Sequence, residues 1–79
     1  MKFSVTITLK KDVLDPQGKV VQNTLINLGM LDLKSIRQGK YFEVELNEKD
    51  EARGKKKVNE MCEKLLANLI IEDYKINKL

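Results

Sequence analysis

The sequence contains one cysteine, Cys62, and no histidine. A thiol nucleophile needs a neighbouring base, and a structural zinc site needs several cysteine or histidine ligands. Cys62 also falls on the apolar face of a predicted helix, and an apolar setting raises the pKa of a thiol. We therefore interpret Cys62 as a buried structural residue, and we predict neither a catalytic residue nor a metal site in this chain.

Two neighbouring carboxylates near the C-terminus, Glu72 and Asp73, could in principle act as an acid–base pair. The pattern around them predicts a strand, in which successive side chains point to opposite faces. The two groups then cannot act on one substrate, and we interpret this corner, with Asn68 as a helix terminator, as structural or interfacial. The sequence also contains no phosphate-binding glycine loop, so no cofactor-binding residue is predicted.

Two short turns contain the remaining groups that could bind a partner. The first includes Asp15, Gln17 and Gly18. It could present backbone N–H groups at a helix N-terminus to an anion or to a carboxylate of a partner. The alternative is a plain strand-to-helix turn with a capping residue.

The second turn is basic and contains Arg37, Gly39 and Lys40. It could bind phosphate or dock against an acidic protein surface, because a guanidinium donates in a planar fork. The alternative is a solvated hairpin turn. We take the residues of both turns as candidates for a subunit interface.

Length and composition limit the possible protein classes. The 79 residues form a single domain, 1–79, with 42% hydrophobic and 34% charged residues and a net charge of +3. A core of this size is marginal, and without disulfides or a metal the usual remedy is oligomerisation. The lysines at 55–57 are more typical of a solvated helix face than of a nucleic-acid site. No membrane span or signal peptide is predicted, which favours a reduced, cytoplasmic setting.

The first half of the chain predicts a strand followed by a helix. Residues 2–10 alternate between polar and apolar side chains, which is typical of a half-buried strand. Asp15 can cap a helix, Pro16 suits its first position, and Gly29 suits the position just after its end. Gly18 is unusual in a first turn, where its missing side chain either relieves crowding or lets a partner approach the backbone.

The middle of the chain predicts two strands and a second helix. The strands are residues 31–37 and 40–46, with a turn or bulge at 38–39. Asn47 can cap the helix, whereas Gly54 weakens its first half and allows a later start. Its apolar residues recur at helical spacing: Val58, Met61, Cys62, Leu65, Leu66 and Leu69.

Residues 70–76 predict a last strand, so the expected order is β-α-β-β-α-β. We expect an α+β fold in which two helices cover one face of a small antiparallel sheet, as in a ferredoxin-like or related sandwich. The edge strands of such a sheet expose unpaired N–H and C=O groups. Dimerisation about a two-fold axis would cover them and complete the core.

Several short segments of this sequence, in this order and spacing, resemble the PurS family, the small subunit of phosphoribosylformylglycinamidine synthase. The resemblance spans nearly the whole chain. Its segments are Val13-Leu14-Asp15-Pro16-Gln17-Gly18, Leu28-Gly29, Ile36-Arg37, Gly39-Lys40, Leu65-Leu66-Ala67-Asn68 and Ile70-Ile71-Glu72-Asp73-Tyr74. One departure is Leu69, where relatives commonly have proline, which would sharpen the break between helix and strand.

The resemblance implies a non-catalytic subunit of an ATP-dependent, glutamine-using ligase in de novo purine biosynthesis. A glutaminase subunit (PurQ) releases ammonia, and a synthetase subunit (PurL) uses ATP and magnesium. The PurS-like chain, as a dimer or higher even oligomer, is expected to bridge the two and assist ammonia transfer, with no cofactor of its own. From the residues alone, the alternative is a free-standing RNA-binding α/β module that uses the basic turn and Tyr41.

Overall fold

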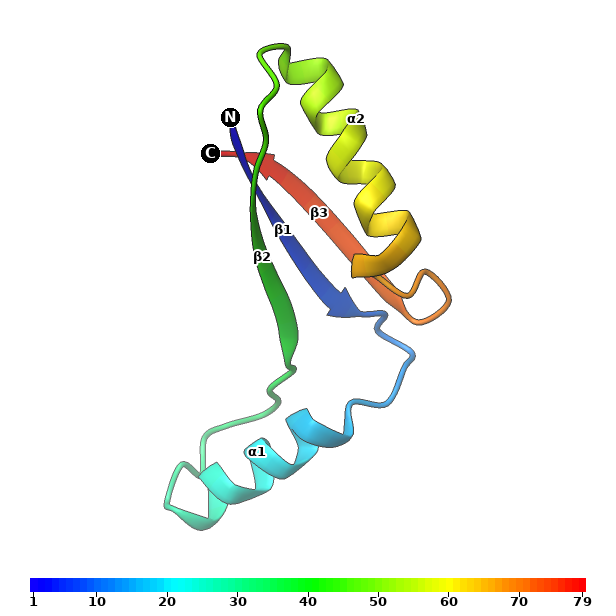
Figure 1. Ribbon diagram of the computed structural model, residues 1–79. Coiled ribbons are helices and arrows are strands. Elements are labelled where there is room, and N and C mark those ends of the chain that lie inside the picture. The colour runs from blue at the N-terminus through cyan, green and yellow to red at the C-terminus, as the bar shows by residue number, and fades with distance from the viewer.

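The computed structural model describes residues 1–79 as a short sheet with one helix packed on it and one helix beyond its end (Figure 1). The α+β class expected from the sequence is confirmed. The elements in chain order are β1 (Lys2–Leu9), α1 (Pro16–Asn27), β2 (Gly39–Glu45), α2 (Glu51–Met61), a π-helical turn η1 (Cys62–Leu66) and β3 (Glu72–Lys78).

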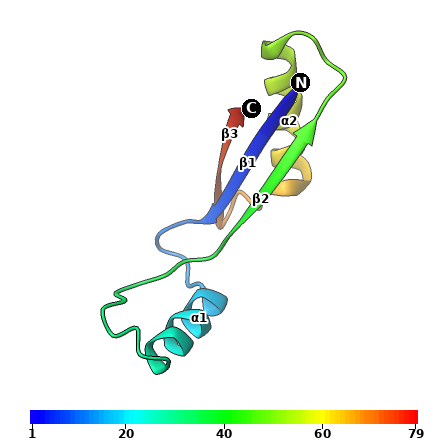
Figure 2. The ribbon, with the colours of Figure 1, turned by 90° about the vertical axis from the view of Figure 1, so that its left-hand side faces the viewer.

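The three strands form an antiparallel sheet in the order β2-β1-β3. In the register, Val5 of β1 lies opposite Phe42 of β2 and Ile76 of β3, which places apolar side chains of all three strands on one face. The alternation in β1 decides this arrangement, because a shift by one residue would exchange the two faces. The other face carries the polar residues of β1, including Thr6 and Thr8, and no helix covers it (Figure 2).

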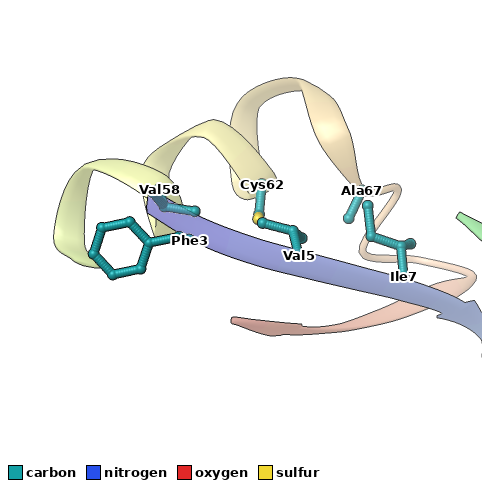
Figure 3. Packing of buried hydrophobic residues seen from close by; sticks show 6 residues of the cluster. All are labelled: Phe3, Val5, Ile7, Val58, Cys62 and Ala67. Atoms are coloured by element: carbon teal, nitrogen blue, oxygen red, sulfur yellow. The ribbon is translucent and has the colours of Figure 1, made fainter. Parts of the chain in front are cut away.

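The core lies between the apolar face of β1 and helix α2 with its π-helical turn (Figure 3). Only 10 of 79 residues are buried, which leaves this protomer with a very small core. The buried apolar residues are Phe3, Val5, Ile7, Val58, Cys62 and Ala67.

Helix α2 can approach β1 closely because residue 54 is glycine. A Cβ atom at Gly54 would lie 2.9 Å from the sulfur of Met1 and 3.0 Å from the ring of Phe3. Both distances are shorter than a normal van der Waals contact. The helix begins at Glu51, and Asp50 accepts a hydrogen bond from the N–H of Ala52 as its cap.

Helix α1 lies beyond the end of the sheet rather than on its face (Figures 1 and 2). The radius of gyration is 16.0 Å, whereas a compact chain of this length has about 12 Å. Large apolar side chains on and after α1 are consequently exposed, among them Val20 at 65%, Leu28 at 72% and Leu31 at 79%. We call residues 16–36 the arm, because this segment extends away from the sheet.

Parts of the predicted arrangement are wrong. Residues 31–37 form no strand, because the chain returning from the arm contacts α1, where Gln22 donates to the carbonyl of Lys34, and reaches no sheet edge. Helix α1 does not cover the sheet as a ferredoxin-like sandwich would require. Asn47 is not the cap of α2. The prediction for Gly29 is confirmed: it follows the end of α1 with a φ of 106°.

Gly54→Val should destabilise the protein by about 1–3 kcal/mol, the usual cost of overpacking a core, because the new side chain meets the ring of Phe3. Chemical denaturation followed by circular dichroism measures this change. Lys56→Val introduces the same β-branched side chain at an exposed position of α2 and is the control. Equal effects of the two substitutions would contradict the close packing of α2 at residue 54.

Glu48 should make the stability depend on acid pH. Its carboxylate accepts from Lys57 Nζ at 2.8 Å and from the N–H groups of Asp50 and Lys49, which lowers its pKa to about 2. The free energy of unfolding gained from this ionised group is present above about pH 4.3, the pKa of an unfolded Glu, and is lost as the pH falls towards 2. The difference in melting temperature between the parent and Glu48→Gln should therefore shrink over this range. Glu60→Gln, which removes an exposed carboxylate on α2, is the control for the loss of one charge.

Candidate functional site

Both turns predicted from the sequence lie together where the arm leaves the sheet (Figure 1). We call residues 10–18 and 35–40 the junction. The first segment follows β1 and the second precedes and opens β2, and these strands are paired, with Thr8 opposite Gly39. The antiparallel pairing of β1 and β2 thus brings the two turns side by side, although residues 19–34 separate them in the sequence.

The Asp15 carboxylate connects the two segments of the junction. Its Oδ1 accepts from the N–H of Gly18 at 3.0 Å, and its Oδ2 accepts from the N–H of Gln38 at 2.7 Å. Asp15 is buried, and these two hydrogen bonds, first that of Gln38, together with the charge of Arg37, lower its pKa. The predicted helix cap is confirmed. The hydrogen bond to Gln38 could not be foreseen, because a backbone N–H leaves no mark in the sequence.

Arg37 holds the other side of the junction. Its Nη1 donates to the carbonyl of Lys11 at 3.1 Å, and its Nη2 donates to the carbonyls of Lys10 at 3.1 Å and Val13 at 2.8 Å. A planar guanidinium can reach several acceptors at once, which a lysine cannot do. Arg37 therefore fastens the loop after β1 to the segment that enters β2.

Glycine is required at two positions of the junction. A Cβ atom at Gly18 would collide with the Asp15 carboxylate and lie 3.0 Å from the carbonyl oxygen of Ile36. A Cβ atom at Gly39 would lie 2.6 Å from the carbonyl oxygen of Ile7. Of the two interpretations considered for Gly18, the structure shows that the missing side chain relieves crowding.

Lys40 and Glu72 connect the junction to the loop before β3. Lys40 Nζ lies 3.3 Å from Glu72 Oε2 and donates to the carbonyl of Leu66 at the end of η1, also at 3.3 Å. Glu72 in turn accepts from the N–H of Asn68 at 2.7 Å. Gln17 lines a shallow cleft beside Lys40. Glu72 thus has a structural role, and Asp73 lies opposite Thr8 on the other face of the sheet.

A larger cleft of about 330 Å³ opens between the loop after β1 and the start of α1. Three cationic side chains line it, those of Lys11, Lys19 and Arg37, together with the carboxylates of Asp12 and Asp15. The cleft has no nucleophile with a neighbouring base, and Asp15 is already hydrogen-bonded through both oxygens. Its groups are suited to binding an acidic group, and not to general acid–base catalysis.

Cys62 lies in the core, fully buried against β1 (Figure 3). Burial raises the pKa of its thiol, and the nearby Glu63 carboxylate adds to this effect. The prediction of a buried structural cysteine is confirmed. No group of three or more cysteine, aspartate or glutamate side chains is placed to hold a metal ion, and no helix is long and apolar enough to cross a membrane.

A comparison with known protein families gives a match over nearly the whole chain. Residues 2–79 match the family model PurS, described as phosphoribosylformylglycinamidine (FGAM) synthase. This chain belongs to the PurS family. The FGAM synthase subunit PurS of Bacillus subtilis is 46% identical over 74 residues, which cover 94% of this chain and 87% of that protein. The PurS subunit of Methanocaldococcus jannaschii is 41% identical over 75 residues, covering 95% and 90%.

Solved structures of PurS proteins have the same fold. The crystal structure of M. jannaschii PurS, one of the subunits of formylglycinamide ribonucleotide amidotransferase in the purine biosynthetic pathway, superposes with a TM-score of 0.86 at 42% identity. It covers 96% of this chain and 92% of that chain. A chain of the PurLQS structure from Thermotoga maritima gives a TM-score of 0.90 at 28% identity, covering 99% and 95%. The chain is accordingly a PurS subunit of FGAM synthase.

Cys62→Ala should lower the free energy of unfolding by on the order of 1 kcal/mol, because a buried sulfur is removed from the core. Cys62→Ser should cost more, because it places a hydroxyl among apolar side chains. Denaturation curves of both variants measure this order. Glutamine-dependent turnover of FGAM synthase containing Cys62→Ala should match that of the parent, and a complete loss with folding intact would show that the thiol takes part in the chemistry.

Proposed function

We propose that this PurS chain is the non-catalytic subunit that bridges a glutaminase (PurQ) and a synthetase (PurL) and assists the transfer of ammonia between them. The observation that carries the proposal is the near-complete superposition on a chain of the T. maritima PurLQS structure. The complex would act in the cytoplasm, with ATP and magnesium used by the large subunit and no cofactor bound by this chain.

The chemistry of the reaction explains why such a subunit is useful. Ammonia released from glutamine becomes ammonium in water at neutral pH, and ammonium is not a nucleophile. A subunit that keeps the two active sites aligned and excludes water between them preserves the reactive form. This role needs binding surfaces and shape rather than catalytic groups, which agrees with the side chains that the junction provides.

The surface of the protomer supports assembly into a homodimer or a higher even oligomer. The outer strands are β2 and β3, and each has one edge that no other strand of the sheet pairs with. Exposed edges and large apolar side chains are features that proteins usually cover. The exposed side chains of the arm add apolar area that the protomer itself does not cover.

We further propose the junction as part of the docking surface for the larger subunits. The cleft has a net positive lining, with Lys11, Lys19 and Arg37 against the carboxylates of Asp12 and Asp15, which suits an acidic loop of a partner. Of the six residues proposed from the sequence, Asp15 and Arg37 line this cleft. Gln17, Gly39 and Lys40 line a smaller cleft that shares Asp15, and Gly18 lines a third that shares Arg37.

The structure disfavours the alternative of an RNA-binding module. Such sheets stack bases on several aromatic side chains of an open face. Here Tyr41, opposite Thr6, is the single aromatic residue on the open face, because Phe42 and Tyr74 lie opposite Val5 and Ile7 on the helix-covered face. The open face also lacks the strongly basic character of a phosphate-binding surface, because the lysines Lys2 and Lys75 lie beside three carboxylates, Glu43, Glu45 and Asp73.

The proposal is tested by adding the purified chain to PurL and PurQ subunits of the same organism. Glutamine-dependent synthesis should appear only when the chain is present, whereas ammonia-dependent synthesis by PurL should proceed without it. Size-exclusion chromatography should show the three proteins eluting together. The chain alone should neither hydrolyse ATP nor release ammonia from glutamine. Glutamine-dependent synthesis at an unchanged rate without the chain would overturn the bridging role.

A further inference from the structure

The direction of the arm relative to the sheet depends on the junction. The strands pack extensively against one another and α2 packs on its π-helical turn and β3, but α1 has no comparable packing with any other element. Two backbone connections join the arm to the sheet, one after β1 and one before β2. Two backbone connections alone still allow the arm to rotate about the line between them. Further interactions must therefore fix the angle between the arm and the sheet.

The Asp15 carboxylate crosses this possible hinge. One oxygen binds Gly18 in the first turn of α1, and the other binds Gln38, the residue directly before β2. A single buried side chain therefore links the arm helix to the sheet through two hydrogen bonds, of 3.0 and 2.7 Å. A Cβ atom at residue 18 would collide with this carboxylate, so only glycine leaves room for it beside the first turn of α1.

An ionised carboxylate is particularly suited to this place. Both of its oxygens accept, so each can take one backbone N–H. An asparagine of the same size has one accepting oxygen and one donating NH₂ group, so it can cap the helix or bind Gln38, but not both. Arg37 supports the same arrangement from the side by binding the carbonyls of Lys10, Lys11 and Val13.

We propose that Asp15 is a positioning residue, whose carboxylate holds the arm at a fixed angle to the sheet, and that assembly of the glutaminase with the synthetase requires this angle. Only the second half, that assembly requires this angle, rests on the proposed bridging function. The first half, the fixed angle, concerns this chain alone and is measured without the partners.

The angle is measured by the distance between two spin labels in the full chain. Cysteines at Asn23 in α1 and at Thr6 in β1, both exposed, carry the labels in a Cys62→Ala background, and an excess of unlabelled chain isolates the distance within one protomer. Asp15→Asn should broaden the distance distribution, while circular dichroism should show the helices preserved, because asparagine still caps a helix. Asp12→Asn makes the same change of charge in the same loop and should leave the distribution narrow.

The second readout is turnover in the reconstituted complex, with variants that carry no labels. Asp15→Asn should reduce glutamine-dependent synthesis about tenfold at limiting chain, the effect of losing one hydrogen bond to a charged group, and leave ammonia-dependent synthesis unchanged. Glu60→Gln, which also removes one exposed carboxylate but lies on α2 outside the junction, should behave as the parent in both assays. If the parent chain does not support glutamine-dependent synthesis, the proposed function fails, whatever the labels show.

Arg37→Lys provides an independent variant if Asp15→Asn fails to fold. It keeps the charge and the Asp15 hydrogen bonds but removes the planar fork, and it should broaden the same distribution and reduce the same rate. A narrow distribution in the folded variants would overturn the fixed-angle role of the junction. A broadened distance distribution together with a parental rate of glutamine-dependent synthesis would show that assembly does not require the fixed angle, and would overturn that half of the proposal.

Discussion

The hydrogen bonds of the Asp15 carboxylate are the interaction on which the shape of this protein depends. The sheet and α2 form a small self-contained core, but the arm extends from it without packing of its own. Asp15 links the first turn of α1 to the entrance of β2. A buried, ionised carboxylate satisfied by two backbone N–H groups is directional, whereas apolar packing is not. The junction contains few residues and little apolar packing, so a directional group of this kind is needed to fix the direction of the arm.

The distribution of apolar residues follows from the same arrangement. Val20, Leu28 and Leu31 lie on or after α1 and are exposed, because the arm does not fold back onto the sheet. The extended form leaves the apolar residues exposed for other protein surfaces. This division agrees with a PurS subunit of FGAM synthase, for which exposed contact area is more useful than a large core of its own.

The junction also explains why residues predicted as an interface have local structural roles. Gly18, Gly39 and Arg37 are each required by close contacts or hydrogen bonds within the chain. Their participation in binding PurQ or PurL remains a prediction, and a structural role does not conflict with it. A surface that larger subunits bind must be held in one shape, and these residues hold it.

The amino-acid sequence by itself determined the local elements and the family. The alternation at residues 2–10 predicted β1. The ends of α1 were marked by Asp15, Pro16 and Gly29. The segments shared with PurS proteins identified the family. These signals are local, because caps and periodicity act within a few residues. The tertiary structure alone decided that residues 31–37 form no strand, that α1 leaves the sheet, and that Asp15 binds Gln38. These features depend on contacts between segments that are distant in the sequence and on hydrogen bonds of backbone groups. Every residue type has such backbone groups, so the sequence does not show which of them are used.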